Sequence, residues 1–132
     1  MEARVTGIGG VFFKARDADS LRAWYARHLK LAIADWGGTS FRSPAARGDG
    51  RSVETVWSIF SASSDYFAPS AAPFMINYRV SDLEAVLESL RAEGCDVDPK
   101  TETSQFGKFG WVMDPEGNRI ELWEPPPGGV AE

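Results

Sequence analysis

The chain has one cysteine, Cys95, and one histidine, His28, among its 132 residues. A single cysteine excludes an internal disulfide and a cysteine-rich zinc site. His28 follows Trp24 and Tyr25 in a helical pattern, near the expected end of the helix, where a basic side chain interacts favourably with the helix dipole. We therefore interpret His28 as a structural residue and expect no redox centre.

The chain also lacks a run of Lys or Arg and any apolar stretch of transmembrane length. Its formal net charge is −5, so the electrostatic attraction that drives binding to nucleic acids or anionic membranes is missing. Residues 1–10 carry charges where a secretory signal needs an apolar segment. We therefore predict a cytoplasmic protein that binds neither nucleic acid nor membrane.

Hydrophobic residues make up 43% of the chain and aromatic residues 12%, enough to build a core. This length fits one folding unit, so we predict a single domain over residues 1–125. Residues 125–129 read Pro-Pro-Pro-Gly-Gly. We accordingly predict that residues 126–132 form a flexible tail.

Two segments, residues 10–17 and 75–82, share one pattern: a strand, then an aspartate, then a helix. Asp17 or Asp19 in the first segment and Asp82 in the second are suitable N-caps, because a carboxylate accepts hydrogen bonds from the first amides of a helix. The sequence therefore contains an internal repeat.

Strand-like segments follow each predicted helix. They cover residues 32–36, 39–41 and 53–61 in the first half, and 95–100, 109–113 and 118–124 in the second. Each unit, about residues 5–62 and 70–125, thus has the order β-α-β-β-β. This order predicts an α+β fold, with a curved, mixed, mostly antiparallel sheet, helices outside and a concave face left for a ligand.

The segment Asp114-Pro-Glu-Gly-Asn118 has the composition of a tight turn between two strands. Side chains alternate along the strand that follows, so Ile120 and Leu122 share one face while Glu121 and Trp123 share the other. Glu121 is therefore delivered to a defined face of a strand. It is the main candidate for a functional carboxylate.

The doubled unit, the first helix with Trp24-Tyr25, and the closing Asp114-Pro-Glu-Gly-Asn-Arg-Ile-Glu121 together resemble the vicinal oxygen chelate superfamily. That superfamily includes glyoxalase I, bleomycin-resistance proteins and extradiol dioxygenases. The resemblance extends over about residues 5–125. It implies the glyoxalase fold, and it implies a divalent metal held between the halves in the enzymes of the group.

In those enzymes each half supplies two metal ligands, from its first and its last strand. Carried onto this sequence, the four positions fall on Gly10, Trp57, Met75 and Glu121. Among them Glu121 alone could bind a hard or borderline divalent metal. We therefore predict that the chain uses no cofactor and holds no metal, with a divalent metal at Glu121 as the alternative.

We predict a small-molecule-binding protein related to the glyoxalases and bleomycin-resistance proteins, with Asn77 and Glu121 orienting a partly aromatic organic ligand. The alternative is a metal-dependent lyase, isomerase or dioxygenase of the same superfamily. A third possibility is a small interaction partner with a vestigial cavity. The predicted ligand-binding residues are Phe12, Trp57, Met75, Asn77, Arg79, Trp111, Glu121 and Trp123, and Glu121 is also a possible general acid or base.

Two other interpretations stay open at this level. The aromatic side chains could simply fill the concave side, with Glu121 paired to Lys14 or Arg79. Tyr66 and Phe67, like Phe106 and Phe109, could form a rim over a pocket or a dimer contact. We also expect a homodimer, and an exposed loop at residues 42–50 that could close over a ligand.

Overall fold

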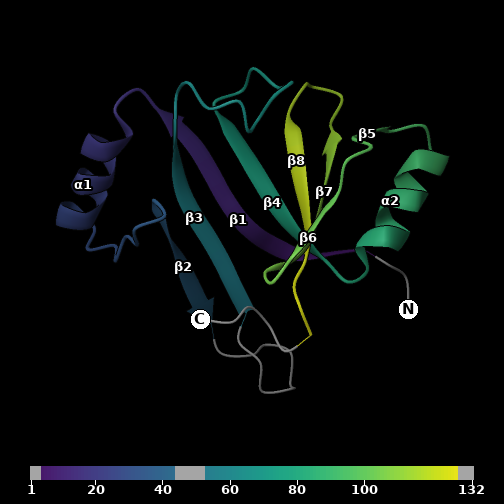
Figure 1. The fold of residues 1–132 in the computed structure, drawn as a ribbon, viewed down its shortest axis with the longest axis horizontal. Coiled ribbons are helices and arrows are strands. Elements are labelled where there is room, and N and C mark those ends of the chain that lie inside the picture. Colours follow the sequence, from purple (N-terminus) through teal and green to yellow (C-terminus); the bar gives the residue numbers. More distant parts are fainter. Residues whose placement is uncertain (1–3, 44–52, 128–132) are drawn as a thin grey trace.

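The computed structural model describes residues 4–43 and 53–127. Among these residues, eight strands form one sheet with the order β2-β3-β1-β4-β8-β7-β5, and β6 pairs with β7 outside this path (Figure 1). The strands are β1 (Val5–Ala15), β2 (Gly38–Ser43), β3 (Val53–Ser61), β4 (Phe74–Val80), β5 (Asp96–Val97), β6 (Glu102–Ser104), β7 (Gly107–Met113) and β8 (Arg119–Glu124). The helices are α1 (Ala18–His28) and α2 (Leu83–Ala92).

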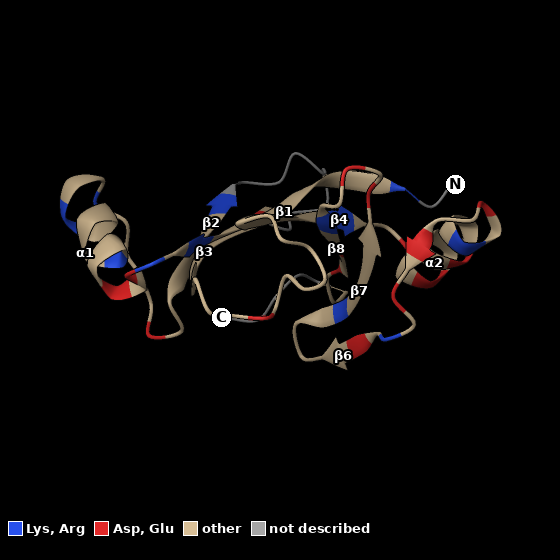
Figure 2. Ribbon diagram, turned by 90° about the horizontal axis from the view of Figure 1, so that it is seen from above, with Lys and Arg blue, Asp and Glu red and all other residues tan. Residues whose placement is uncertain are grey.

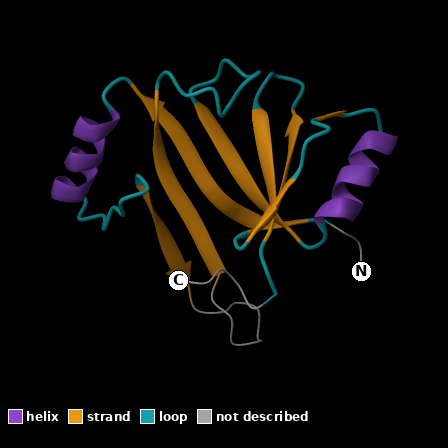
Figure 3. Ribbon diagram, viewed as in Figure 1, coloured by secondary structure: helices purple, strands orange, loops and turns teal. Residues whose placement is uncertain are grey.

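The sheet is mixed. β1 and β3 run parallel, as do β4 and β8, whereas the other paired strands are antiparallel. The sheet arches between the two helices, which lie at its opposite ends (Figures 2 and 3). The predicted α+β fold, with its curved and mostly antiparallel mixed sheet, is confirmed.

Both helices pack on one face of the sheet, which we call the outer face. Tyr25 of α1 packs edge-on against Phe13 and Trp57. Leu83 and Leu87 of α2 are buried in a cluster with Val80, Val112 and Leu122. This placement confirms the prediction that the helices lie outside, and we call the opposite face the inner face.

The helix starts follow from capping. The Asp17 carboxylate accepts a hydrogen bond from the backbone N–H of Ser20 at 3.0 Å, and this bond lowers the pKa of Asp17. The carboxylate of Asp82 accepts from the backbone N–H of Ala85 at 3.2 Å. Both predicted N-caps are therefore confirmed, with Asp17 rather than Asp19 in the first unit.

The closing hairpin also forms as predicted. One oxygen of Asp114 accepts from the backbone N–H groups of Glu116 and Asn118, each at 2.9 Å. The Asn118 amide donates to the other oxygen at 2.9 Å. At the end of β8, the carboxylate of Glu124 accepts from the backbone N–H of Leu83 at 2.8 Å, so it binds the N-terminus of α2. The turn at the start of β8 and the Glu124 bond at its end together fix the path of the strand.

Some sequence predictions fail locally. Residues 32–36 do not form a strand, because a turn joins Ala34 and Gly38 by a 2.8 Å backbone hydrogen bond and Gly37 adopts a positive φ of 99°. β5 is shorter than predicted, and β6 was not predicted. Most of the loop at 42–50 and residues 128–132 of the predicted tail lie outside the described residues. Within residues 4–43 and 53–127, neither helix is long and apolar enough to cross a membrane.

Candidate functional site

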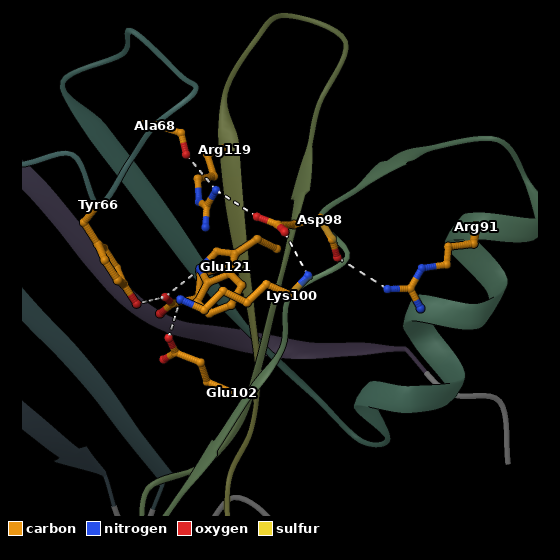
Figure 4. Close-up of polar contacts among 9 residues, drawn as sticks. Tyr66, Ala68, Arg91, Asp98, Lys100, Glu102, Arg119 and Glu121 are labelled. Carbon is orange, nitrogen blue, oxygen red and sulfur yellow. Dashed lines mark hydrogen bonds and ion pairs between the residues drawn. The ribbon is translucent and has the colours of Figure 1, made fainter.

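Glu121 lies at the centre of the inner face, where the strand register surrounds it with polar groups. It sits between Asn77 of β4 and Trp111 of β7. The amide Nδ2 of Asn77 donates to Oε1 of Glu121 at 2.7 Å, and the indole Nε1 of Trp111 donates to Oε2 at 3.0 Å. The Tyr66 hydroxyl, from the segment between β3 and β4, donates to Oε2 at 2.5 Å (Figure 4). Three neutral donors from three parts of the chain therefore meet at one carboxylate.

The carboxylate is buried, with only 2% of Glu121 exposed. Burial of a carboxylate is costly unless hydrogen bonds replace its hydration, and the three donors supply such bonds. Burial and the negative charge of Glu121 also raise the pKa of Tyr66 well above its usual value. The phenol therefore stays protonated and remains a donor to Glu121.

No Lys or Arg in the described part of the chain forms an ion pair with Glu121. Lys14 lies over the ring of Phe67, with its Nζ 5.2 Å from the ring centroid. Arg79 donates to the backbone carbonyls of Ile8 at 2.7 Å and Glu54 at 2.5 Å. The suggested pairing of Glu121 with Lys14 or Arg79 is therefore wrong.

The segment between β3 and β4 covers the inner face. Phe67 is fully buried in a cluster with Phe12, Met75 and Trp111. Tyr66 stacks on Phe60, with ring centroids 5.5 Å apart, and remains 37% exposed. Aromatic side chains thus fill much of this face, as one of the two open interpretations proposed, and Tyr66 is the exposed edge of the cover.

The predicted ligand-binding residues share the inner face, with one exception. Trp57 lies on the outer face instead, 5.6 Å from the ring of Phe13 and 4.9 Å from that of Tyr25. The parallel register pairs Phe12 with Ser58, so even-numbered residues of β3 face inward. The residues on the inner face are Phe12, Met75, Asn77, Arg79, Trp111, Glu121 and Trp123.

A β-bulge in β1 explains why glycines lie at the expected ligand position. The register between β1 and β4 shifts between Ile8 and Gly10. A Cβ on Gly9 would collide with Asn77 and lie 2.8 Å from the Trp123 ring, while one on Gly10 would lie 2.9 Å from the Phe12 ring. Both glycines therefore face inward, and their missing side chains make room for the groups around Glu121.

The side chains around Glu121 do not fit a metal ion. Both of its oxygens already accept hydrogen bonds from N–H or O–H groups, and these donors occupy the places at which a metal ion would bind. Within the described residues there is also no group of three or more His, Cys, Asp or Glu side chains that could hold a metal. The roles argued for this site are therefore those of its own side chains.

Tyr66 is the functional candidate that the sequence identified least well. It appeared there as a residue of a rim or a dimer contact, whereas the structure bonds it directly to Glu121. Its segment has no periodicity, and the bond spans most of the second half of the chain. A tyrosine in an irregular segment near aromatic neighbours was the available signal, and it did not point to Glu121.

A family model described as a glyoxalase-like domain matches residues 10–123. No curated protein matches the sequence.

Solved structures with this fold include methylmalonyl-CoA epimerases. One from Mycobacterium tuberculosis is 24% identical, with a TM-score of 0.58, and the match covers 93% of this chain and 90% of that one. Another, in complex with methylmalonyl-CoA and NH4+, is 14% identical, with a TM-score of 0.67 and coverage of 97% and 100%. A glyoxalase/bleomycin resistance protein/dioxygenase superfamily member from Vibrio splendidus is 11% identical, with a TM-score of 0.55 and coverage of 93% and 99%.

These comparisons correct one prediction and settle another. The prediction that the chain uses no cofactor is wrong. It rested only on the residue types at the four expected ligand positions, whereas proteins of this superfamily are generally metal-dependent. The predicted superfamily is confirmed by the match over residues 10–123 and by the shared fold. The chain belongs to the glyoxalase-like domain family, within the vicinal oxygen chelate superfamily that its closing motif resembles.

Proposed function

We propose that this chain is a small-molecule-binding member of the glyoxalase-like family, and that its ligand contacts Glu121 on the inner face. The observation that carries the proposal is a buried carboxylate held by three neutral donors, with no cation paired to it among the described residues. A buried carboxylate and its polar partners, taken together, contribute little to stability compared with a set of apolar side chains of similar volume. Its presence at the centre of the sheet therefore favours a role in recognition.

The polar groups around Glu121 indicate how a ligand would bind. Asn77 and Trp111 are each 2% exposed, whereas Tyr66 is 37% exposed and covers the carboxylate from the outside. The Oδ1 atom of Asn77 is buried and accepts no hydrogen bond. A ligand that displaces the Tyr66 hydroxyl and donates its own hydrogen bonds would satisfy both Glu121 and Asn77. This favours a flat ligand with hydroxyl, amide or amine groups, bound against the surrounding aromatic rings.

The proposal is tested by screening a fragment set of phenols, anilines and aromatic amides by ligand-observed NMR, followed by titration of the hits. Glu121→Gln removes the charge at nearly constant shape, so it should weaken a genuine ligand by roughly tenfold or more. Tyr66→Phe removes the competing hydroxyl and should strengthen binding. Tyr78→Phe, on the outer face, is the matched control and should change nothing. Hits that bind the Glu121→Gln variant equally well would contradict the proposal.

A proton-transfer enzyme is the second candidate. The Glu121 carboxylate, which could act as a base, lies 2.5 Å from the protonated Tyr66 hydroxyl, which could donate a hydrogen bond to a reacting oxygen. Methylmalonyl-CoA epimerases are among the similar structures, so this thioester is a suitable first substrate. The test is deuterium incorporation at C2 of methylmalonyl-CoA in D2O, with and without added divalent metals. Exchange that is lost in Glu121→Gln would establish the enzyme and replace the binding function.

We also propose a homodimer, formed through α1 and the segment that follows it. Among its described residues α1 has no buried side chain, and Trp24, Leu29 and Trp36 are each at least half exposed. Such an apolar surface suits a second copy of the chain. Light scattering should give twice the chain mass for the native protein and the single mass for Trp24→Glu. Phe106→Glu, at another exposed aromatic residue, should leave the mass unchanged.

The remaining proposals concern the setting of the protein. Its net charge of −5 supports the absence of a nucleic-acid partner. Its single cysteine, Cys95, is unpaired and exposed, which fits a reducing cytoplasm. A gel-shift assay against random DNA and RNA at low salt tests the first of these proposals. Fractionation of cells that express the protein tests the second.

A further inference from the structure

A cavity of about 230 Å³ lies beside the Glu121 site, at the end of the β7–β8 hairpin. Its walls come from the segment with Pro69, from β5 and the residues that follow it, and from Trp111, Met113 and Arg119. Trp111 therefore contributes to both places: its indole nitrogen bonds to Glu121, and the residue lines the cavity. The function proposed for Glu121 does not involve this cavity.

Arg119 is the cation of this cavity, and its charge is only loosely matched. The side chain is 11% exposed, and its guanidinium lies over the Trp111 ring, 5.0 Å from the centroid. Its Nη1 donates to the carbonyl of Ala68 at 2.7 Å and reaches a carboxylate oxygen of Asp98 at 3.4 Å (Figure 4). Its Nε is buried and donates to no acceptor. A buried donor without an acceptor is unfavourable, so Arg119 is a group that a ligand could satisfy.

We propose that this cavity is a second binding site, for a small flat monocarboxylic acid whose carboxylate bonds to the guanidinium of Arg119. A guanidinium presents paired N–H groups that match the two oxygens of a carboxylate. Pro69, Trp111 and Met113 provide the apolar surface for a flat body. The volume lies just below the range of roughly 300–1,000 Å³ that is typical for drug-sized ligands, so the ligand is small.

The other charges of the cavity restrict the ligand to one negative charge. Asp96 and Asp98 both line the wall. A second carboxylate or a phosphate group would lie close to one of them, where like charges repel. Asp98 already pairs with Nη1 of Arg119 at 3.4 Å, so a ligand carboxylate would take the Nε side, and the cavity therefore selects a monoanion over a dianion. The proposed contacts do not include Glu121, so this proposal can be tested separately from the function proposed for the inner face, although Trp111 borders both sites.

The test uses the full 132-residue chain, labelled with nitrogen-15, and benzoate as the probe. Benzoate should give saturable shifts of the Nε–H signal of Arg119 and of the indole N–H signal of Trp111. Benzamide has the same shape without the charge and should bind roughly tenfold more weakly or worse. Phthalate and inorganic phosphate should not produce these shifts. Equal binding of benzoate and benzamide, or stronger binding of phthalate or phosphate, would overturn the proposal.

Arg119 also donates a hydrogen bond to the carbonyl of Ala68, so its replacement could disturb the fold. The site is therefore located with two variants, one at Arg119 and one at Met113. Arg119→Gln should lose benzoate binding, while Arg27→Gln, an exposed arginine of α1, should keep it. Met113→Trp fills the cavity and leaves the guanidinium in place, and it should also abolish binding. The side-chain amide signals of Asn77, which report on the Glu121 site, should not shift with benzoate, and this separates the cavity from the inner-face site. Benzoate binding that survives in a folded Met113→Trp or Arg119→Gln protein would refute the site.

Discussion

The hydroxyl of Tyr66 donates a 2.5 Å hydrogen bond to the buried carboxylate of Glu121. This bond fastens the irregular segment between β3 and β4 to the centre of the sheet. Because the Tyr66 ring is partly exposed, water can replace the hydroxyl when it is removed. The bond therefore holds the cover of the inner face in place at its exposed edge.

Tyr66→Phe should lower the free energy of unfolding by about 1.5 kcal/mol, the lower end for a hydrogen bond to a charged group, because water reaches the site. Urea unfolding measures the change. Hydrogen exchange should also rise in the segment between β3 and β4 and stay constant in α2. Tyr78→Phe is the control, since Tyr78 packs on the outer face. An equal loss in both variants would mean that the hydroxyl bond to Glu121 has no special role.

Glu121→Leu should destabilise the protein more than Tyr66→Phe does. The substitution removes the acceptor of three donors, two of which belong to the buried residues Asn77 and Trp111. Buried donors without an acceptor cost about 1–3 kcal/mol each, so a loss of roughly 2–6 kcal/mol is expected for the two. Glu88→Leu, at an exposed position of α2, should lose less than about 0.5 kcal/mol. A Glu121→Leu protein as stable as the native one would show that the site is held together by apolar packing instead.

Gly9→Ala tests the bulge that makes room for the polar site. The new Cβ would collide with Asn77 and lie 2.8 Å from the ring of Trp123, both of which are buried. Overpacking of this kind costs about 1–3 kcal/mol. At Gly7 a Cβ would instead meet the flexible end of Arg79, 2.5 Å away, which can move more easily. Thermal melts should therefore rank Gly9→Ala below Gly7→Ala, and the reverse order would contradict the bulge argument.

The strand patterns in the sequence predicted most of the fold and part of the site. Alternation along the closing strand placed Glu121 and Trp123 on one face, and the parallel pairing of Asn77 with Glu121 puts a second predicted residue beside them. The prediction that Trp57 faces inward is wrong, because the register between β1 and β3 depends on pairing across the sheet. A slip of one residue turns every side chain to the other face.

Other features lacked a signal in the sequence. Residues 32–36 look like a strand, but the turn closed by Gly37 and Gly38 prevents pairing there. Arg119 shares the closing motif with Glu121, yet its position over Trp111 depends on β7 lying beside β8. Contacts that join irregular segments to strands are set by the packed structure, and local patterns do not encode them.

Asp114 gives the protein a predictable response to acid. Hydrogen bonds from Asn118 and Glu116 hold the pKa of Asp114 below its ordinary value of 3.8. The folded state therefore binds this proton less readily than the unfolded state does. The stabilisation by Asp114 is full above the ordinary pKa, and it is lost as the pH falls through the lowered folded value.

Asp114→Ala should accordingly be less stable than the native protein at neutral pH, and the difference should shrink in acid. Urea unfolding at about pH 7, 4.5 and 3 measures it, and the two proteins should converge only at the lowest pH. Asp35→Ala, at an exposed residue outside the hairpin, controls for the loss of one negative charge. A difference that stays constant or widens at low pH would mean that the hairpin does not depend on the ionised carboxylate, because only an ionised Asp114 can accept all of these hydrogen bonds at full strength.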